Sequence, residues 1–277
     1  MKNYSKIIIA LVIIVLLGAT AIGIYQFKFT KTVVPEKLST DNFQQIWGKK
    51  EIIIGLDEAY PPITFKNEKG EIVGYDVDLA KEVFKRMGLT PVFRAVEWDT
   101  IVLSLTKGDI DVVWSGMSIN EERQAKINFS DPYFKGAYVY ILKKDATISN
   151  KSELSGKTIG VQAGSSNEEW LRSSPIFSSL KELKTYSTFE EALLDLDIGR
   201  VDAVFGDGTF AYYYINDKKA DYKTFDEIEE GIGAGVGIRK TDNALRDELN
   251  KTLREMKQDG TMQEIAKKWF GNANFVI

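Results

Sequence analysis

Two side chains of opposite charge, Arg123 and Asp207, have the residue type and sequence context to recognise a small charged molecule. Arg123 follows a predicted strand and loop, and its planar guanidinium suits two-point capture of a carboxylate. Asp207 follows another predicted strand, in the run Phe-Gly-Asp-Gly, and ligands of open α/β sheets bind outside the carboxyl ends of strands. Simpler interpretations are that Arg123 pairs with its acidic neighbours at the surface and that Asp207 belongs to an ordinary turn.

The residue types that the chain lacks exclude most catalytic chemistry. Among its 277 residues there is no Cys and no His, which excludes disulfides, thiolate nucleophiles, histidine-based triads and thiolate or imidazole metal sites. The formal net charge of -4 argues against nucleic acid as a partner, because phosphate binding needs a basic face. The composition therefore favours a binding protein over an enzyme, and we expect neither a metal nor a cofactor.

Residues 1–27 are typical of a segment that enters a membrane. Two lysines precede an uncharged stretch over 7–27, whose length of about 30 Å as a helix equals the thickness of a bilayer core. A basic start before an apolar run is also typical of a secretory signal, with 19–21 as the cleavage site. Signal peptide and retained anchor both stay open, and either puts the rest of the chain outside the cytoplasm. Residues 28–50 are predicted to be a tether with a short helix over 41–47.

Beyond the tether, predicted strands and helices alternate, which is the pattern of a parallel α/β sheet. The strands are short apolar runs, and the helices have apolar residues three or four positions apart. Strands are predicted over 51–56, 91–96, 110–114, 158–162, 183–186 and 201–205. Helices are predicted over 76–87, 98–107, 168–172, 189–196, 210–216, 243–258 and 262–269.

Two extended segments, 138–142 and 231–238, lie where the chain would pass between two successive α/β units. Two such passages would return the final helices to the first unit and leave a cleft, which is a preferred place for a ligand. The sequence therefore predicts an α/β fold with two lobes and two crossover strands that form a hinge. We assign lobe 1 to 51–137 with 236–277, and lobe 2 to 138–235.

Five segments between 51 and 270 together indicate a family. They are Gly55-Leu-Asp-Glu-Ala-Tyr-Pro-Pro62, Gly74-Tyr-Asp-Val-Asp-Leu-Ala80, Asp111-Val-Val-Trp-Ser-Gly-Met-Ser-Ile-Asn-Glu-Glu-Arg123, Phe129-Ser-Asp-Pro-Tyr133, and Asp259-Gly-Thr261 with Lys267-Lys-Trp-Phe270. With these segments in order, the chain resembles the polar amino-acid-binding proteins of ABC importers, bacterial extracellular solute-binding protein family 3. Its members include histidine-, lysine/arginine/ornithine- and glutamine-binding proteins. The resemblance implies the two-lobed, type II periplasmic-binding-protein fold.

The resemblance implies that Arg123 holds the α-carboxylate of an amino acid, aided by the hydroxyl of Ser118 and by backbone N–H groups. Ser165 and Ser166 would add contacts to the same carboxylate. They open a predicted helix, where exposed N–H groups favour an anion. An ordinary helix cap at this position is equally compatible with the sequence.

The resemblance also implies that Asp207 holds the α-ammonium group, which Ser115 and Gly116 receive on backbone or hydroxyl oxygen. Tyr60 and Trp98 match aromatic positions that flank the ligand side chain, and flat rings can hold a cation. As single aromatic residues, both would more often belong to the core. Arg123 and Asp207 from opposite lobes would link the lobes only through a ligand that carries both charges.

Asp57 matches the position that reaches the far end of the ligand, and Gln162 matches a further side-chain contact. A carboxylate at Asp57 suits a cationic tip, as in arginine, lysine, ornithine or histidine, and equally the amide of glutamine. Glu58 would add negative charge at the mouth of the site. The sequence therefore predicts a polar, preferably cationic, amino acid and leaves glutamine and cystine open.

The function that the resemblance implies is that of an extracytoplasmic, non-enzymatic protein that captures a free amino acid and delivers it to an ABC permease. We expect a monomer, as is usual in this family. A membrane-anchored amino-acid sensor and a dehydratase-type enzyme on the same fold are the alternatives. A dehydratase would need acid–base groups in place of Arg123 and Asp207, and both residues are present.

Overall fold

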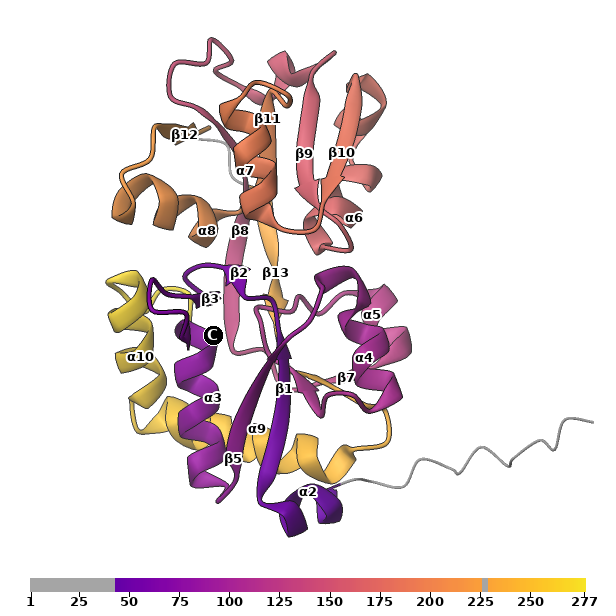
Figure 1. Ribbon diagram of the computed structural model, residues 1–277, viewed down its shortest axis with the longest axis vertical. Helices are drawn as coiled ribbons and strands as arrows, with labels where there is room; N and C mark the ends of the chain where they lie inside the picture. The colour runs from indigo at the N-terminus through magenta and orange to yellow at the C-terminus, as the bar shows by residue number, and fades with distance from the viewer. Residues whose placement is uncertain (1–42, 226–228) are drawn as a thin grey trace, which may run out of the picture. The chain divides into compact units, whose positions relative to one another are not determined.

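Figure 1 shows a computed structural model of the protein, which describes residues 43–225 and 229–277. The predicted signal or anchor over 1–27, and most of the tether over 28–50, lie outside these residues. The described part begins with a short helix, α2 (Phe43–Lys49), two residues later than the helix predicted in the tether. Within the described ranges, no helix has both the length and the apolar character that crossing a membrane requires.

The first sheet has the strand order β5-β1-β6-β14-β7, and β1 runs parallel to both β5 and β6. Its strands are β1 (Glu51–Leu56), β5 (Thr90–Ala95), β6 (Val112–Val113), β7 (Asn128–Phe129) and β14 (Gly237–Ile238). Side chains alternate along β1: Ile52 and Ile54 join one core cluster, and Ile53 packs against another on the opposite face. We call this sheet and its helices lobe 1.

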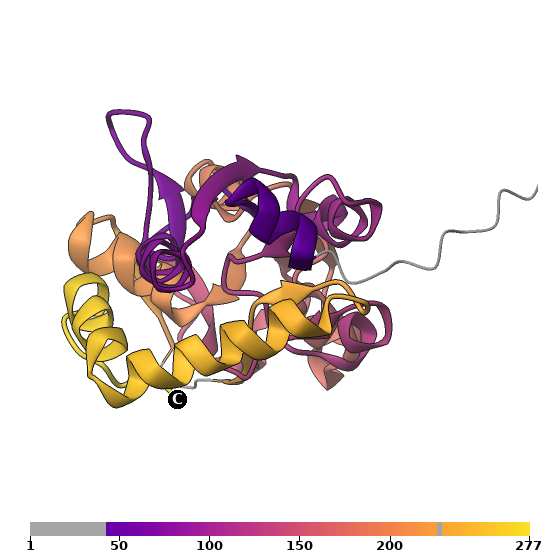
Figure 2. The same ribbon diagram turned by 90° about the horizontal axis from the view of Figure 1, so that it is seen from below.

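Helices cover both faces of the lobe 1 sheet. The face with Ile52 and Ile54 shares its core with α3 (Tyr75–Arg86), α9 (Asn243–Gln258) and α10 (Thr261–Phe270). Figure 2 shows the long helix α9 from below. The opposite face packs against a short 3-10 turn, η1 (Trp98–Thr100), followed by α4 (Ile101–Lys107), and α5 (Glu121–Lys126) precedes β7 in the chain. A small sheet of β2 (Ala59–Tyr60), β3 (Thr64–Lys66) and β4 (Ile72–Val73) borders this lobe.

The second sheet has the order β10-β9-β11-β8-β12, with β13 also paired to β8. Its strands are β8 (Phe134–Lys143), β9 (Thr158–Gln162), β10 (Glu182–Tyr186), β11 (Ala203–Asp207), β12 (Tyr222–Thr224) and β13 (Glu229–Ala234). Helices α7 (Phe189–Asp197) and α8 (Gly208–Tyr212) share one core cluster with this sheet, and α6 (Ser166–Ser173) shares another. Short helical turns cover 151–154, 175–179 and 213–217. We call this sheet and its helices lobe 2.

Two strands carry the chain between the lobes, as the sequence predicted. β8 leaves lobe 1 and runs into the second sheet, and β13 pairs antiparallel with it on the way back (Figure 1). The return segment then enters the first sheet as β14. Gly231 is needed here, because a Cβ at this position would come within 2.4 Å of the carbonyl oxygen of Gly136. The residue boundaries assigned to the two lobes stay a prediction.

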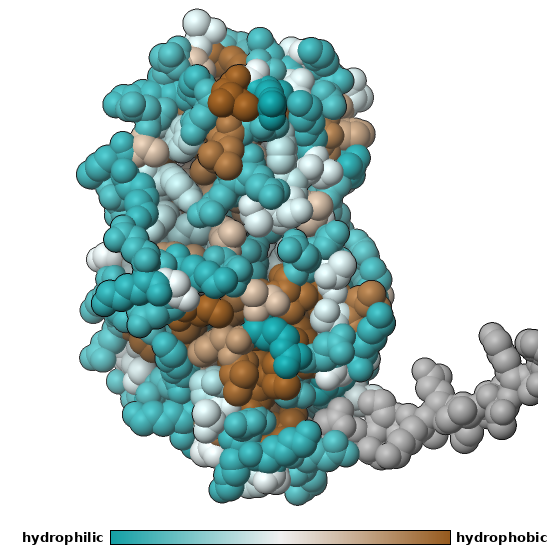
Figure 3. Space-filling view, viewed as in Figure 1, coloured by the Kyte–Doolittle hydropathy of each residue, from teal (hydrophilic) through white to brown (hydrophobic). Residues whose placement is uncertain are grey.

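Most predicted elements occur, with local differences at their ends. The strand predicted over 110–114 is restricted to β6, because the carbonyl of Ile110 accepts a hydrogen bond from buried Arg239 at 2.6 Å instead of joining the ladder. The helix predicted over 210–216 begins earlier, at Gly208, and widens into a π-helix over Tyr213–Asp217. Figure 3 shows that the face seen in Figure 1 is mostly hydrophilic, with hydrophobic side chains in separate areas of both lobes.

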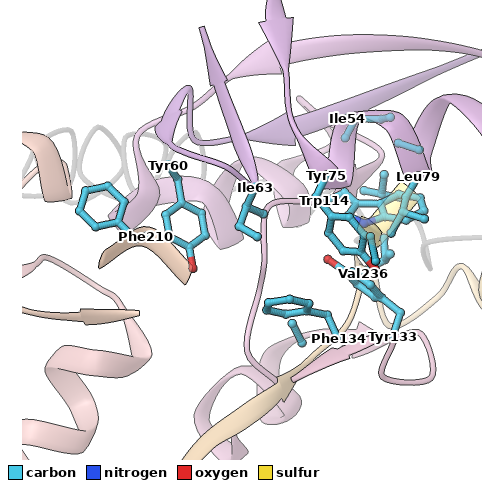
Figure 4. Close-up of a cluster of buried hydrophobic side chains, with 14 of the residues drawn as sticks. Ile54, Tyr60, Ile63, Tyr75, Leu79, Trp114, Tyr133, Phe134, Phe210 and Val236 are labelled. Atoms are coloured by element: carbon cyan, nitrogen blue, oxygen red, sulfur yellow. The ribbon is translucent and has the colours of Figure 1, made fainter. Parts of the chain in front are cut away.

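The segment Gly74–Ala80 joins three parts of lobe 1 at the start of α3. The buried carboxylate of Asp76 accepts hydrogen bonds from Gly116 N at 2.6 Å and from the hydroxyl of Tyr133 at 2.7 Å. Asp78 accepts from Lys268 and Trp269 of α10 at 2.6 and 2.8 Å. Figure 4 shows Tyr75, Trp114 and Tyr133 close together in this core. The N-terminus of α3 therefore ties a loop near the cleft to the start of β8 and to the C-terminal helix.

We predict that Tyr133→Phe lowers the free energy of unfolding by about 1–3 kcal/mol, because a buried carboxylate loses a hydrogen-bond donor. Tyr75→Phe is the matched control, since the Tyr75 hydroxyl is buried in the same cluster and has no hydrogen-bond partner in the described part of the chain. This control should be neutral or slightly stabilising. Urea unfolding of both variants makes the comparison, and equal losses would contradict the role given to Asp76.

Candidate functional site

The predicted site residues follow the carboxyl ends of parallel strands in both lobes. Asp57 follows β1 and Ser115 follows β6, whereas Gln162 and Asp207 are the last residues of β9 and β11. Their strands are parallel within each sheet, so each lobe presents these ends at one edge. A small cavity of about 20 Å³ lies there, and we call it the interlobe cavity. Its lining comprises Asp57, Tyr60, Trp98, Ser115, Gly116, Ser118, Arg123, Gln162, Ser165, Ser166, Asn167, Phe189 and Asp207.

All eleven predicted residues therefore line one cavity, and Asn167 and Phe189 line it as well. The geometry brings the predicted set together, and its role in ligand binding stays a prediction. Asn167 directly follows Ser165 and Ser166 in the sequence, and its polar amide was the signal that could have identified it. The residue is 1% exposed, and its Nδ2 has no partner among the described residues. Phe189 was missed because a single aromatic residue at a helix start carries no specific signal.

Arg123 is buried, with 7% of its surface exposed. Its guanidinium donates to the carbonyl oxygen of Ser118 in lobe 1 and to that of Gly164 in lobe 2, both at 3.0 Å. It also lies over the Trp98 ring, 5.4 Å from the centroid. No described carboxylate lies within ion-pair distance, which is contrary to the surface pairing with Glu121 or Glu122. Burial lowers the pKa of Arg123, so an anionic partner in the cavity would stabilise its charge.

Hydroxyl groups surround the same end of the cavity. Ser165 caps α6 by accepting from Glu168 N at 3.1 Å, so the ordinary cap is present. The hydroxyl of Ser166 lies 2.9 Å from that of Ser118 and accepts from Tyr138 at 3.0 Å. The start of α6 therefore adds dipole and hydroxyl donors beside the guanidinium. A carboxylate is the ligand group that suits this end.

Asp207 supplies the opposite charge from lobe 2. Burial raises its pKa to about 6, and a hydrogen bond from Tyr60 and the charge of Arg123 lower it in part. A raised pKa means that the carboxylate lacks full compensation for its lost hydration. An ammonium group bound here would favour the ionised form. Asp207 and Arg123 together therefore fit the two charges of a free amino acid.

Ser115 and Gly116 are held in place by their neighbours in lobe 1. The Ser115 hydroxyl lies 2.5 Å from the hydroxyl of Thr64 and accepts from Asp57 N at 3.2 Å. Gly116 has φ +60°, a conformation that favours glycine, and a Cβ there would approach the Tyr60 ring to 3.0 Å. Both residues are thus fixed before any ligand contact.

Asp57 lies in the cavity without a cationic side chain within ion-pair distance among the described residues. Its carboxylate accepts from Ala59 N at 2.8 Å and, across the cleft, from the amide of Gln162 at 2.6 Å. Burial raises the pKa of Asp57, and these hydrogen bonds lower it. The charges of Glu190 and Glu97 raise it further, so the surrounding field is negative. A positive group would be favoured at this position.

Aromatic side chains from both lobes close the cavity. The Tyr60 ring lies 5.9 Å from Phe189 and 6.3 Å from Phe210, centroid to centroid. Figure 4 shows Tyr60 beside Phe210. The expectation that Glu58 adds negative charge at the mouth is not supported, because Glu58 is absent from the lining and pairs with Lys66 at 2.7 Å.

Comparison with known proteins matches residues 52–272 to the family "Bacterial extracellular solute-binding proteins, family 3". Over 258 residues, the chain is 30% identical to the L-cystine-binding protein TcyJ of Escherichia coli (strain K12), with 92% of this chain and 94% of that protein covered. It is 34% identical to ABC transporter arginine-binding protein 1 of the same strain, with 80% and 91% covered. It is 36% identical to the histidine-binding periplasmic protein of that strain, with 80% and 88% covered.

Solved structures that resemble this chain are also amino-acid-binding proteins. A substrate-binding protein of an ABC uptake transporter from Streptococcus pneumoniae, crystallised with bound histidine, has a TM-score of 0.80 and 36% identity, with 85% of this chain and 98% of that chain covered. The ancestral amino acid-binding protein AncCDT-1, a precursor of cyclohexadienyl dehydratase, has a TM-score of 0.76 and 32% identity, with 83% and 100% covered.

We predict that Arg123→Ala weakens the binding of an α-amino acid by about 2–5 kcal/mol, because the ligand carboxylate would be buried without its partner. Arg172→Ala is the control, since Arg172 pairs with Glu168 and does not line the interlobe cavity. Isothermal titration of both variants measures the effect. Affinity that survives in Arg123→Ala would refute the carboxylate role.

Proposed function

The chain belongs to family 3 of the bacterial extracellular solute-binding proteins, and on this premise we propose that it captures a free cationic amino acid and delivers it to an ABC permease. The observation that carries the proposal is the set of charges in the interlobe cavity. Arg123 from lobe 1 and Asp207 from lobe 2 line it together, and Asp57 lines it from the end of β1. Capture between two lobes on two strands proceeds by hinge closure.

The charge balance of the cavity favours a cationic side chain. Its lining contains one guanidinium, that of Arg123, and two carboxylates, those of Asp57 and Asp207. The backbone charges of an amino acid can pair with Arg123 and Asp207, which leaves Asp57 as an uncompensated buried charge. Burying an unpaired charge is costly, so a second positive group on the ligand is favoured. Arginine, lysine, ornithine and histidine in its charged form provide one.

Glutamine and cystine are the second candidates, each for a specific reason. The carboxylate of Asp57 already accepts an amide N–H from Gln162, and a glutamine amide could replace that donor. Cystine carries a second ammonium group that could meet Asp57. The relatives that bind cystine, arginine and histidine cover the same range of chemistry.

The proposal extends to location and partners. The protein functions outside the cytoplasm as a monomer, residues 7–27 serve as a signal or anchor, and the permease receives the ligand. No catalytic step is assigned, although one structural relative is a precursor of a dehydratase. Arg123 and Asp207 bind charges in this proposal rather than transferring protons.

A thermal-shift screen of the purified protein against the twenty amino acids, ornithine, citrulline and cystine tests the function. We expect stabilisation by arginine, lysine, ornithine or histidine, of about 2.7 kcal/mol at one hundred times the dissociation constant. A response to glutamine or cystine alone would keep amino-acid capture and refute the cationic preference. The absence of a thermal shift with every amino acid would refute the function. Measuring the amount of each amino acid before and after incubation detects any turnover.

We predict that Asp57→Asn reduces the preference for a cationic over a neutral amino acid by about 10- to 100-fold, because the hydrogen bond to a charged group is lost. The amide oxygen of the substituted side chain can still accept from Ala59 N, so the loop stays supported. Asp99→Asn is the control, because Asp99 lies outside the lining. Competition titrations with L-arginine and L-glutamine give the ratio, and an unchanged ranking would remove Asp57 from specificity.

A further inference from the structure

Residues 118–123 of lobe 1 face residues 164–169 of lobe 2 and make three direct contacts across the cleft. Two of them involve residues of the interlobe cavity: Ser118 with Ser166, and Arg123 with the carbonyl of Gly164. The third joins the side-chain amide of Asn120 to the carboxylate of Glu169. Asn120 and Glu169 do not line the interlobe cavity; both line a neighbouring groove of about 500 Å³.

Asn120 has two roles that its two amide atoms divide. Its Oδ1 accepts from Arg123 N at 2.9 Å and caps α5, the helix that carries the buried guanidinium. Its Nδ2 donates to Glu169. Serine and aspartate cap helices about as well as asparagine, so the cap does not require an amide. A hydrogen bond to Glu169 does require an amide. Aspartate would repel that carboxylate, and serine is too short to cap α5 and reach Glu169 at the same time.

The position of the contact makes it costly to lose. Asn120 is 8% exposed, so replacing Glu169, which is itself exposed, would leave the Nδ2 of Asn120 unpaired and largely without water. The bond exists only while the two lobes are together, since its partners belong to different lobes. It therefore stabilises the closed arrangement and contributes nothing to an open one.

We propose that Asn120 and Glu169 form an affinity-determining contact outside the ligand cavity, which favours closure of the lobes whatever the ligand side chain. This inference rests on the proposed function, because it assumes that ligand capture closes the lobes. Loss of the contact weakens every ligand by the same factor, and the ranking of ligands stays as it is. The change appears mainly as faster dissociation.

Glu169 also acts on Arg123 through space, because its charge raises the pKa of the guanidinium. A variant of Glu169 alone therefore mixes two effects. A double-mutant cycle separates them, since only the direct contact makes the two substitutions non-additive.

The cycle uses Asn120→Ser, Glu169→Ala and the double variant in the full chain, titrated with L-arginine, L-histidine, L-glutamine and L-cystine. Asn120→Ser keeps the cap and the net charge, and we expect it to weaken each ligand that binds by about 5- to 10-fold. The double variant should be no weaker than the weaker single variant. Additive losses, a changed ranking or an unchanged affinity of Asn120→Ser would each overturn the proposal.

Asn150→Ser is the matched control. Asn150 caps the turn at Lys151–Leu154 by accepting from Ser152 N at 3.0 Å, and its amide donates to Glu153 at 2.9 Å. The substitution thus keeps the cap and removes an amide-to-carboxylate hydrogen bond of the same kind, inside lobe 2 alone. It should leave affinity unchanged, and a loss equal to that of Asn120→Ser would refute a specific interlobe effect.

A ligand-independent measurement separates this inference from the proposed function. The chain has no Cys, so Lys85→Cys in lobe 1 and Lys181→Cys in lobe 2 can carry a pair of spin labels. Without amino acid, Asn120→Ser should shift the interlobe distances toward longer values, and Asn150→Ser should not. An unchanged distribution would overturn the contact. A shift in a protein that binds none of the amino acids of the thermal-shift screen would overturn the proposed function and keep the contact.

Discussion

The structure is organised around a buried cation whose anionic partner is not one of the described side chains. Arg123 is almost fully enclosed, yet its hydrogen bonds go to two backbone carbonyls, one from each lobe. Carbonyl dipoles and the Trp98 ring compensate part of the lost hydration, but not a full charge. Asp207 is likewise a buried charge without full compensation, but a negative one, and burial raises its pKa. Both groups gain most from a ligand that brings the complementary charges.

The fold places these charges through the ends of its strands. Arg123 follows the β6 loop on α5, and Asp207 ends β11, so the two charges belong to separate lobes, which β8 and β13 connect. Within lobe 1, Asp76 bonds both to Gly116 in the cavity wall and to Tyr133 just before β8. Hydrogen bonds through Asp76 thus connect the cavity wall to the residue before β8.

Much of this could be predicted from the sequence, because the relevant signals are local. The apolar run of β1 and β9 and the spacing of α9 agree with the structure to the residue. The site residues were identified by their positions in motifs after strands. The role of Gly74–Ala80 could not be predicted, because Asp76 and Asp78 act on residues far along the chain. The contact between Asn120 and Glu169 could not be predicted for the same reason. The two residues belong to different lobes, and no spacing pattern in the sequence indicates that they meet.

In our proposal, the residues that recognise the ligand and the residues that favour closure of the lobes lie at different places. The residue types at the two places differ accordingly. Inside the cavity, the charges of Glu190 and Glu97 make the field at Asp57 negative, and we propose that this field discriminates among ligand side chains. Outside the cavity, the side-chain amide of Asn120 donates a hydrogen bond to the carboxylate of Glu169. This bond attracts the lobes to each other without adding charge near Arg123. A carboxylate in place of this amide would cap α5 equally well and would oppose both closure and the binding of an anionic group. Substitutions at 57 or 162 can therefore change which ligand fits. The contact between Asn120 and Glu169 favours closure to the same extent for every ligand.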